Sequence, residues 1–195
     1  MKELVFLLEE SSAKAMLDSL LPRILNEGTN FRCIPFEGKQ DLEKQLTRKI
    51  RAYQNDQARF IVLRDQDSHP DCTKVKQRLL DLCAQSGKLG KCLVRIACKE
   101  LEAFYLADLL AVEQALDLNG LAKQQQVKKF RAPDMLGSPS RELKTLTSNR
   151  YEKVAGSRSI GKHLNLDNGR SPSFRNLIAA IRDSGVKVLA VVSNN

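Results

Sequence analysis

Three short acidic segments, each following an apolar run, contain the side chains best suited to chemistry in this sequence. Their acids are Glu9, Glu10, Asp65, Asp67, Glu100 and Glu102. If the apolar runs are parallel strands, their carboxyl ends meet at one edge of a sheet, where ligands bind in α/β folds. Clustered carboxylates raise one another's pKa unless a cation lies among them, and oxygen ligands suit Mg²⁺ or Mn²⁺. The sequence therefore predicts a divalent metal site at this edge.

The candidate catalytic residues are Glu9, Asp65 and Asp67, and the candidate metal ligands are these three together with Glu100 and Glu102. A single acid after a strand is more often a helix cap or a solvated loop residue, but three acidic strand ends on one edge favour the metal. The Asp-x-Asp spacing predicts both carboxylates on one side of an extended turn. If a helix begins at Glu100, residues two apart diverge by about 200°, so only one of Glu100 and Glu102 reaches the metal. Glu100 is the preferred ligand.

The elements that must position these acids alternate between strand and helix patterns. Apolar runs predict strands at Leu4–Leu8, Phe31–Phe36, Arg59–Leu63 and Cys92–Cys98. Helical spacing predicts one helix capped by Ser11 or Ser12 and ending near Pro22, a second from about Asp41 to Tyr53, a third closed by Gly87, and a long one from Lys99 to about Leu116. This order predicts an α/β, Rossmann-like fold with a mostly parallel sheet flanked by helices.

The length of 195 residues favours a single domain. We expect a core at about 1–118 plus 170–195, and a polar helical insertion or C-terminal subdomain at about 119–169, with short helices at Pro133–Leu136 and Ser140–Leu146. A helix at Ser173–Arg182 follows, and the apolar run Val186–Val192 could complete the sheet.

Composition narrows the class of protein further. No apolar run approaches the ~20 residues that span a bilayer, so we expect a soluble, cytoplasmic protein without a membrane partner. The five cysteines form no Cys-x-x-Cys pair and the two histidines are too few for a His-rich site. The net charge of +9 favours an anionic partner such as nucleic acid.

Two stretches of the sequence resemble the TOPRIM domain, a family that includes topoisomerases, bacterial primases and the nuclease portions of overcoming-lysogenization-defect proteins. They are the strand and helix of 4–21, with Glu9, and the strand of 60–67, which ends in Asp65-Gln-Asp67. Glu100-Leu-Glu-Ala-Phe and Arg170-Ser-Pro-Ser-Phe-Arg175 are similar to a bacterial TOPRIM-like family found beside ATPases in mobile or defence-related loci. The resemblance implies a TOPRIM fold and a Mg²⁺-dependent nuclease acting with a partner ATPase. It makes Glu9 a metal ligand or acid/base group, and Asp65 and Asp67 the metal-binding pair.

Basic and hydroxyl side chains near these acids and in a later Ser-rich stretch are candidate phosphate contacts. They are Lys14, Arg64, Lys99, Arg158, Lys162, Arg170, Ser171, Ser173 and Arg175. Ser171 and Ser173 precede a predicted helix N-terminus, a natural anion site. The segment Gly156–His163 nearly spells a phosphate-binding P-loop, but His163 stands where the loop needs Ser or Thr and no buried strand precedes it. We therefore do not predict ATP hydrolysis.

Two other functions stay open. A catalytically decayed nucleic-acid-binding or ATPase-binding subunit is favoured by Glu10, where TOPRIM proteins usually have Gly, and by Ala13, where nuclease members often have a further acid. A phosphoacceptor receiver would use Asp65 and Lys187, but the Asp-x-Asp pair, the insertion and the basic charge count against it. The sequence leaves open DNA or RNA as substrate, the mode of cleavage and whether the chain forms a homo-oligomer.

Overall fold

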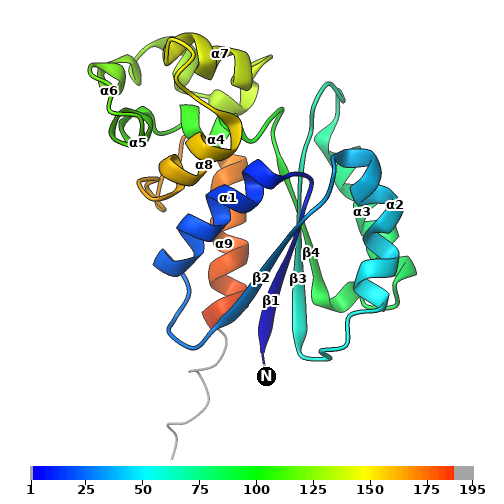
Figure 1. Cartoon of the computed structure of the whole chain (residues 1–195). Helices are drawn as coiled ribbons and strands as arrows, with labels where there is room; N and C mark the ends of the chain where they lie inside the picture. The colour runs from blue at the N-terminus through cyan, green and yellow to red at the C-terminus, as the bar shows by residue number, and fades with distance from the viewer. Residues whose placement is uncertain (1, 187–195) are drawn as a thin grey trace, which may run out of the picture.

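The computed structural model describes residues 2–186 and contains a central parallel sheet with helices on both faces (Figure 1). Four strands lie in the order β2-β1-β3-β4, and all neighbours are parallel. The strands are β1 (Glu3–Leu8), β2 (Asn30–Pro35), β3 (Ala58–Asp65) and β4 (Cys92–Ala97). The predicted α/β, Rossmann-like class and the four predicted strands are confirmed.

The helices connect these strands and continue after β4. They are α1 (Ser11–Leu20), α2 (Lys39–Arg51), α3 (Cys72–Gln85), α4 (Glu102–Leu106), α5 (Leu109–Ala115), α6 (Leu121–Gln124), α7 (Pro139–Leu146), α8 (Lys153–Gly161) and α9 (Pro172–Val186). Single 3₁₀ turns lie at Leu21–Arg23, Leu89–Lys91, Lys128–Phe130 and Pro133–Met135.

The continuous apolar run of β1 is explained by burial on both faces of the sheet. Leu4, Phe6 and Leu8 pack in the cluster beneath α1 and α9, whereas Val5 and Leu7 pack in the cluster beneath α2 and α3. Successive side chains of a strand point to opposite faces, so only an unbroken apolar run fills both clusters. The strand end, and with it Glu9, is therefore fixed from two sides.

Two details of the helices differ from the sequence prediction. Glu10, not Ser11 or Ser12, is the N-cap residue of α1. The long helix predicted from Lys99 to Leu116 is wrong: the chain forms α4 and α5 separately, because the Asp108 carboxylate accepts the backbone N–H of Ala111 at 3.2 Å and caps α5. Lys99 has a φ of 63°, which places it in the turn before α4.

The helices α4 to α8 lie above the carboxyl ends of the strands (Figure 1), and their apolar residues Leu109, Leu143 and Ile160 belong to the same cluster as those of α1. Gly161 allows α8 to pack closely on α1, since a Cβ at this position would lie 2.6 Å from the Met16 carbonyl oxygen. A Cβ at Gly156 would lie 2.5 Å from the Tyr151 ring. The glycines that imitate a P-loop thus serve the packing of α8 over the sheet edge.

The apolar run Val186–Val192 begins at the last described residue, so the strand predicted there and Lys187 lie outside the described residues. Within residues 2–186, no helix is both long and apolar enough to span a membrane.

Candidate functional site

Glu9 follows the last residue of β1 and reaches across to the end of β3. Its backbone N–H donates to the Leu63 carbonyl at 3.2 Å, and its Oε2 accepts the backbone N–H of Asp65 at 3.0 Å. Burial raises the pKa of Glu9; the hydrogen bond from Asp65 opposes this, and the charge of Asp67 adds to it. The parallel register therefore brings the first two predicted site residues together.

Asp65, the last residue of β3, lies at the centre of the acidic group. Burial raises the pKa of Asp65 well above its ordinary value, and the carboxylates of Glu9, Glu102 and Glu10 raise it further. A hydrogen bond from the Leu101 backbone acts in the opposite direction. Since each charge acts on Asp65, the ends of β1 and β3 and the start of α4 meet at one edge, as the sequence predicts.

Glu102 is the acid of the third segment that faces this group. It is almost fully buried as the first residue of α4, and its Oε1 accepts a hydrogen bond from the Tyr151 hydroxyl at 3.0 Å. Burial raises the pKa of Glu102. The Glu100 carboxylate instead accepts the backbone N–H of Ser140 at 2.6 Å, at the start of α7. The structure thus places Glu102, and not the preferred Glu100, beside Asp65, whereas Glu100 binds a helix end.

Asp67 has a different environment from Asp65. Its φ of 55° ends the extended conformation expected for the Asp-x-Asp turn, and its carboxylate forms an ion pair with Lys39 at 2.9 Å. Its backbone N–H donates to the carbonyl of Lys99 at 2.7 Å, which ties the β3 and β4 ends together. Backbone in this region costs energy for a non-glycine residue and often accompanies functional sites. Asp67 lies near Glu9 but does not share the buried position of Asp65.

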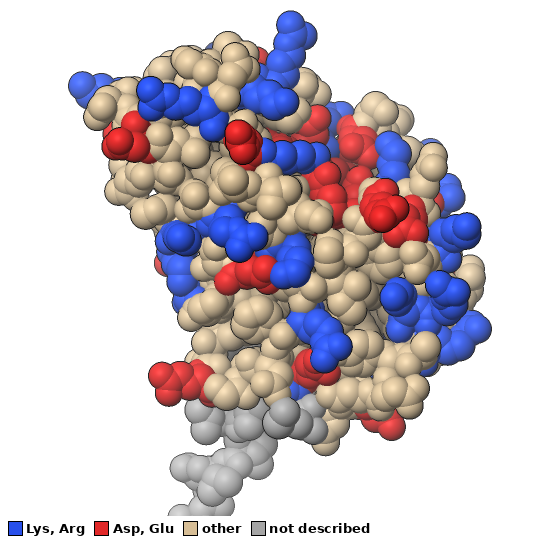
Figure 2. All heavy atoms as spheres, in the orientation of Figure 1, with Lys and Arg blue, Asp and Glu red and all other residues tan. Residues whose placement is uncertain are grey.

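The carboxylates at the border of the group have cations of the protein beside them. Lys153 of α8 lies 2.7 Å from Glu10, and the Arg64 guanidinium lies 3.8 Å from Glu9. Between residues 2 and 186, neither Asp65 nor Glu102 forms an ion pair. The centre of the acidic group is therefore less compensated than its border. Figure 2 shows acidic side chains gathered near the upper edge of the sheet.

The donor types suit a hard divalent cation, since carboxylate oxygens are the ligands that Mg²⁺ and Mn²⁺ prefer. Within the described part of the chain, no group of three or more His, Cys, Asp or Glu side chains is arranged ready to hold a metal ion. Binding by Glu9, Asp65 and Glu102 would thus require their side chains to rotate toward a common point.

The predicted phosphate contacts are divided between surface and interior. Arg158, Lys162, Arg170 and Arg175 are exposed, and Lys99 is half-buried beside Asp67. Arg64 is only 8% exposed, with its guanidinium 3.2 Å from Glu43, and Lys14 pairs with Asp18. Arg64 and Lys14 are therefore paired with carboxylates of the protein.

The predicted anion site at the start of α9 is occupied by a side chain of the protein. The Ser171 hydroxyl donates to Asp134 at 2.6 Å, and the Ser173 backbone N–H donates to the same carboxylate at 2.8 Å. Both serines are buried. Asp134 therefore already supplies the anion that this helix end attracts, and neither hydroxyl is exposed to a phosphate.

Sequence reasoning missed Gln66, Tyr151 and Lys153. The buried Gln66 amide donates to the His69 carbonyl at 2.7 Å and accepts the Lys99 N–H at 3.3 Å, so it holds the β3 and β4 loops together. Gln66 could have been found from the sequence, because it is a polar residue between the two candidate acids Asp65 and Asp67. Tyr151 and Lys153 come from far along the chain, and no local pattern links them to the edge.

The fold and this edge define a Rossmann-like α/β protein with an acidic group at the carboxyl ends of its parallel strands. A family model described as domain of unknown function (DUF4276) matches residues 8–182, and the chain belongs to this family. No curated protein matches the chain, and no solved structure does.

Proposed function

We propose that the protein is a Mg²⁺- or Mn²⁺-dependent nucleic-acid phosphodiesterase, a nuclease of TOPRIM type. The observation that carries the proposal is the Asp65 carboxylate, which has a raised pKa among Glu9, Glu10 and Glu102 and no ion-pair partner in residues 2–186. Crowded, partly buried carboxylates repel one another, and a divalent cation among them removes that repulsion.

The roles follow from the environment of each side chain. Asp65 and Glu102 would hold the cation, with Glu9 as a third ligand or as the proton donor. The Oε2 of Glu9 already accepts the Asp65 N–H, so this carboxyl is held at the strand end, where it would exchange a proton with a leaving oxygen. The Lys153 ammonium lies at the border, 2.7 Å from Glu10, and Lys99 belongs to the turn that bonds to Asp67 through its backbone. Both side chains would orient a phosphate. A bound Mg²⁺ would neutralise phosphate charge and lower the pKa of an attacking water.

The test is cleavage of DNA and RNA, single- and double-stranded, with Mg²⁺, with Mn²⁺ and with EDTA. We expect metal-dependent cleavage by the wild type that is lost in Glu9→Gln. Glu37→Gln is the matched control, since Glu37 is exposed in the loop after β2 at the same end of the sheet. Cleavage that persists in EDTA, or in Glu9→Gln at the wild-type rate, would refute the proposal.

A non-catalytic binding subunit is the second candidate, and one set of contacts favours it. Three of the acids have partners within the protein: Asp67 with Lys39, Glu10 with Lys153, and Glu100 with the start of α7. Calorimetric titration with Mg²⁺ separates the two candidates. A decayed site takes up no metal at millimolar concentration, whereas the nuclease binds Mg²⁺ and loses that binding in Asp65→Asn.

The proposal has three further parts, which rest on the resemblance and the composition: regulation by a partner ATPase, a role in bacterial defence and a cytoplasmic location. Assaying cleavage with and without an ATPase encoded beside this chain tests the first of them.

A further inference from the structure

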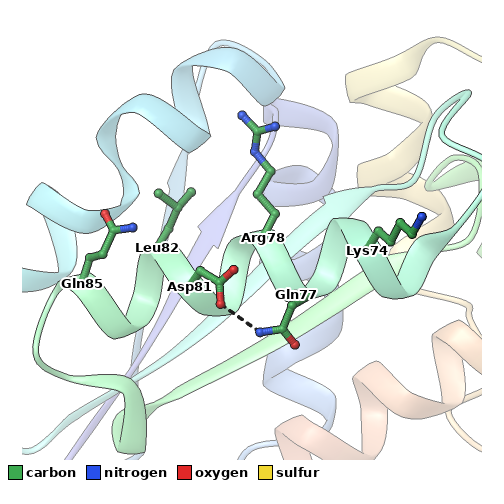
Figure 3. A pocket seen from close by; sticks show the side chains of 6 residues that line it. All are labelled: Lys74, Gln77, Arg78, Asp81, Leu82 and Gln85. Carbon is green, nitrogen blue, oxygen red and sulfur yellow. Dashed lines mark hydrogen bonds between the residues drawn. The ribbon is translucent and has the colours of Figure 1, made fainter.

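A shallow, solvent-open groove runs along one side of α3 and continues between α3 and α2, on the face of the sheet opposite α1 and α9. Two adjoining hollows of about 430 Å³ and 370 Å³ share Arg78 and Leu82. Figure 3 shows the residues that line the first of them. The lining residues are Lys74, Gln77, Arg78, Asp81, Leu82 and Gln85 in the first hollow, and Gln40, Glu43, Lys44, Arg78 and Leu82 in the second. Leu82 is the one apolar residue among them, and the other side chains end in charged or amide groups.

The two helices that form the groove are strongly basic. α2 contains five Lys or Arg residues and two acids, and α3 contains three and one. Figure 2 shows a group of Lys and Arg side chains over this side of the molecule. Together the two helices contain eight basic and three acidic residues, a net charge of +5.

The acidic side chains of the groove already have partners in the protein, whereas two of its lysines form no ion pair within residues 2–186. Glu43 pairs with Arg78 at 2.7 Å and with Arg64 at 3.2 Å, and Asp81 accepts a hydrogen bond from Gln77 at 2.8 Å. Lys44 and Lys74 are exposed, and neither forms an ion pair anywhere in residues 2–186. The charge of Lys44 acts on the Asp41 carboxylate and that of Lys74 on the Asp71 carboxylate. A polyanion could approach both lysines without breaking an ion pair.

A chain of ion pairs connects the groove with the acidic edge. Arg78 contacts Glu43, Glu43 contacts Arg64, and the Arg64 guanidinium lies 3.8 Å from Glu9. At the N-terminus of α2, Lys39 pairs with Asp67. A ligand that lies along α2 therefore extends toward the candidate site.

We infer that this groove binds the phosphate backbone of nucleic acid and directs it to the acidic edge, an inference that rests on the proposed function for its second half. With 13 residues, α2 is about 20 Å long, which corresponds to roughly six nucleotide steps of one strand. Lys44 and Lys74 contact phosphates, and the Gln40 and Gln85 amides donate to phosphate or sugar oxygens. The contacts are to the backbone, so the binding is independent of base sequence.

The experiment compares Lys44→Ala/Lys74→Ala with Lys123→Ala/Lys128→Ala, which removes two exposed lysines from the α6 region and gives the same net charge. Binding of a short duplex DNA and a short duplex RNA is measured by fluorescence anisotropy in EDTA over a series of salt concentrations. We expect weaker binding by the groove variant at every salt concentration. The slope of log affinity against log salt should fall by about two, one for each lysine. The control should bind like the wild type.

Four results overturn the inference: no binding by the wild type, equal binding by the groove and control variants, a larger loss in the control, or competition by polyglutamate that equals competition by DNA per charge. A cleavage assay with Mg²⁺ separates this inference from the proposed function. If the wild type binds through the groove but cleaves nothing, the inference about the groove stands and the proposed nuclease activity is refuted. If the wild type cleaves and the groove variant binds and cleaves equally well, the proposed nuclease activity stands and the inference about the groove is refuted.

Discussion

The acidic edge and the start of α9 both look like ligand sites in the sequence, but their polar groups are satisfied to different degrees. At the start of α9, the Asp134 carboxylate accepts from the Ser171 hydroxyl and from the Ser173 backbone, and the Ser171 hydroxyl also accepts the Phe174 N–H at 3.1 Å. At the acidic edge, Asp65 is crowded by Glu9, Glu102 and Glu10 and has a raised pKa.

The difference indicates that the polar groups at the start of α9 serve the stability of the fold, whereas those at the acidic edge are not fully satisfied within the protein. A buried polar group that finds all its partners inside the protein stabilises the fold. Like charges brought together without a counter-ion destabilise it, and such clusters are typical of functional sites. This comparison supports a structural role for Asp134 and is the reason why the proposed function assigns its chemistry to Asp65.

Asp65→Asn gives the largest expected effect. The amide keeps an acceptor for the Leu101 N–H and removes the charge that Glu9 and Glu102 oppose. We expect metal-dependent cleavage to fall at least about a hundredfold, since even residues behind metal ligands cost 10- to 100-fold. The free energy of unfolding at neutral pH should rise by roughly 1 kcal/mol. Kinetics and urea denaturation of the same preparation measure both, and a variant that is less stable than the wild type would contradict the comparison.

Asp134→Ala should have the opposite pattern. It removes the carboxylate that accepts from the Ser171 hydroxyl and from the Ser173 backbone N–H at the start of α9, so the free energy of unfolding should fall by about 2 kcal/mol. Cleavage per folded molecule should stay near the wild-type level. Asp56→Ala, at an exposed position, is the control and should change stability by less than about 0.5 kcal/mol. Loss of cleavage with unchanged stability in Asp134→Ala would make α9 part of the site.

The sequence predicted those parts of the fold in which local pattern and packing agree. The run from Leu4 to Leu8 is apolar throughout because both faces of β1 are covered, and the parallel order then places Glu9 beside Asp65. The break between α4 and α5 was missed because the cap by Asp108 competes with a pattern that is helical on both sides.

The site was predicted less completely than the fold, since its distant parts depend on tertiary contacts. Glu100 and Glu102 are two residues apart, and two different tertiary contacts separate them: Glu100 accepts the Ser140 N–H of α7, whereas Tyr151, between α7 and α8, donates to Glu102. Asp134 lies nearly forty residues before the serines that it caps, so no window of sequence reveals that the anion site is filled.

Tyr151→Phe tests the hydrogen bond behind the acidic edge. Without the hydroxyl, Glu102 loses its donor at 3.0 Å, and its pKa should rise further because this bond lowers it. We expect metal affinity to fall by about tenfold and stability by about 1 kcal/mol. The matched control is Tyr53→Phe, which removes the hydroxyl that bonds to Glu3 at the other end of the strands. Calorimetry with Mn²⁺ distinguishes them, and equal affinities for both variants would separate Tyr151 from the site.

The pH dependence of stability gives the smallest and most specific effect. Burial raises the pKa of Asp65, so the folded state binds more protons than the unfolded state between the ordinary pKa of about 4 and the raised one. The contribution of Asp65 to the free energy of unfolding therefore decreases as pH rises through this window. The free energy of unfolding of Asp65→Asn should equal that of the wild type at about pH 4 and exceed it by an increasing amount toward neutral pH. Saturating Mg²⁺ should stabilise the wild type alone. Urea denaturation at several pH values measures this difference. A constant offset between the two proteins would mean that the Asp65 charge is already compensated in the folded chain.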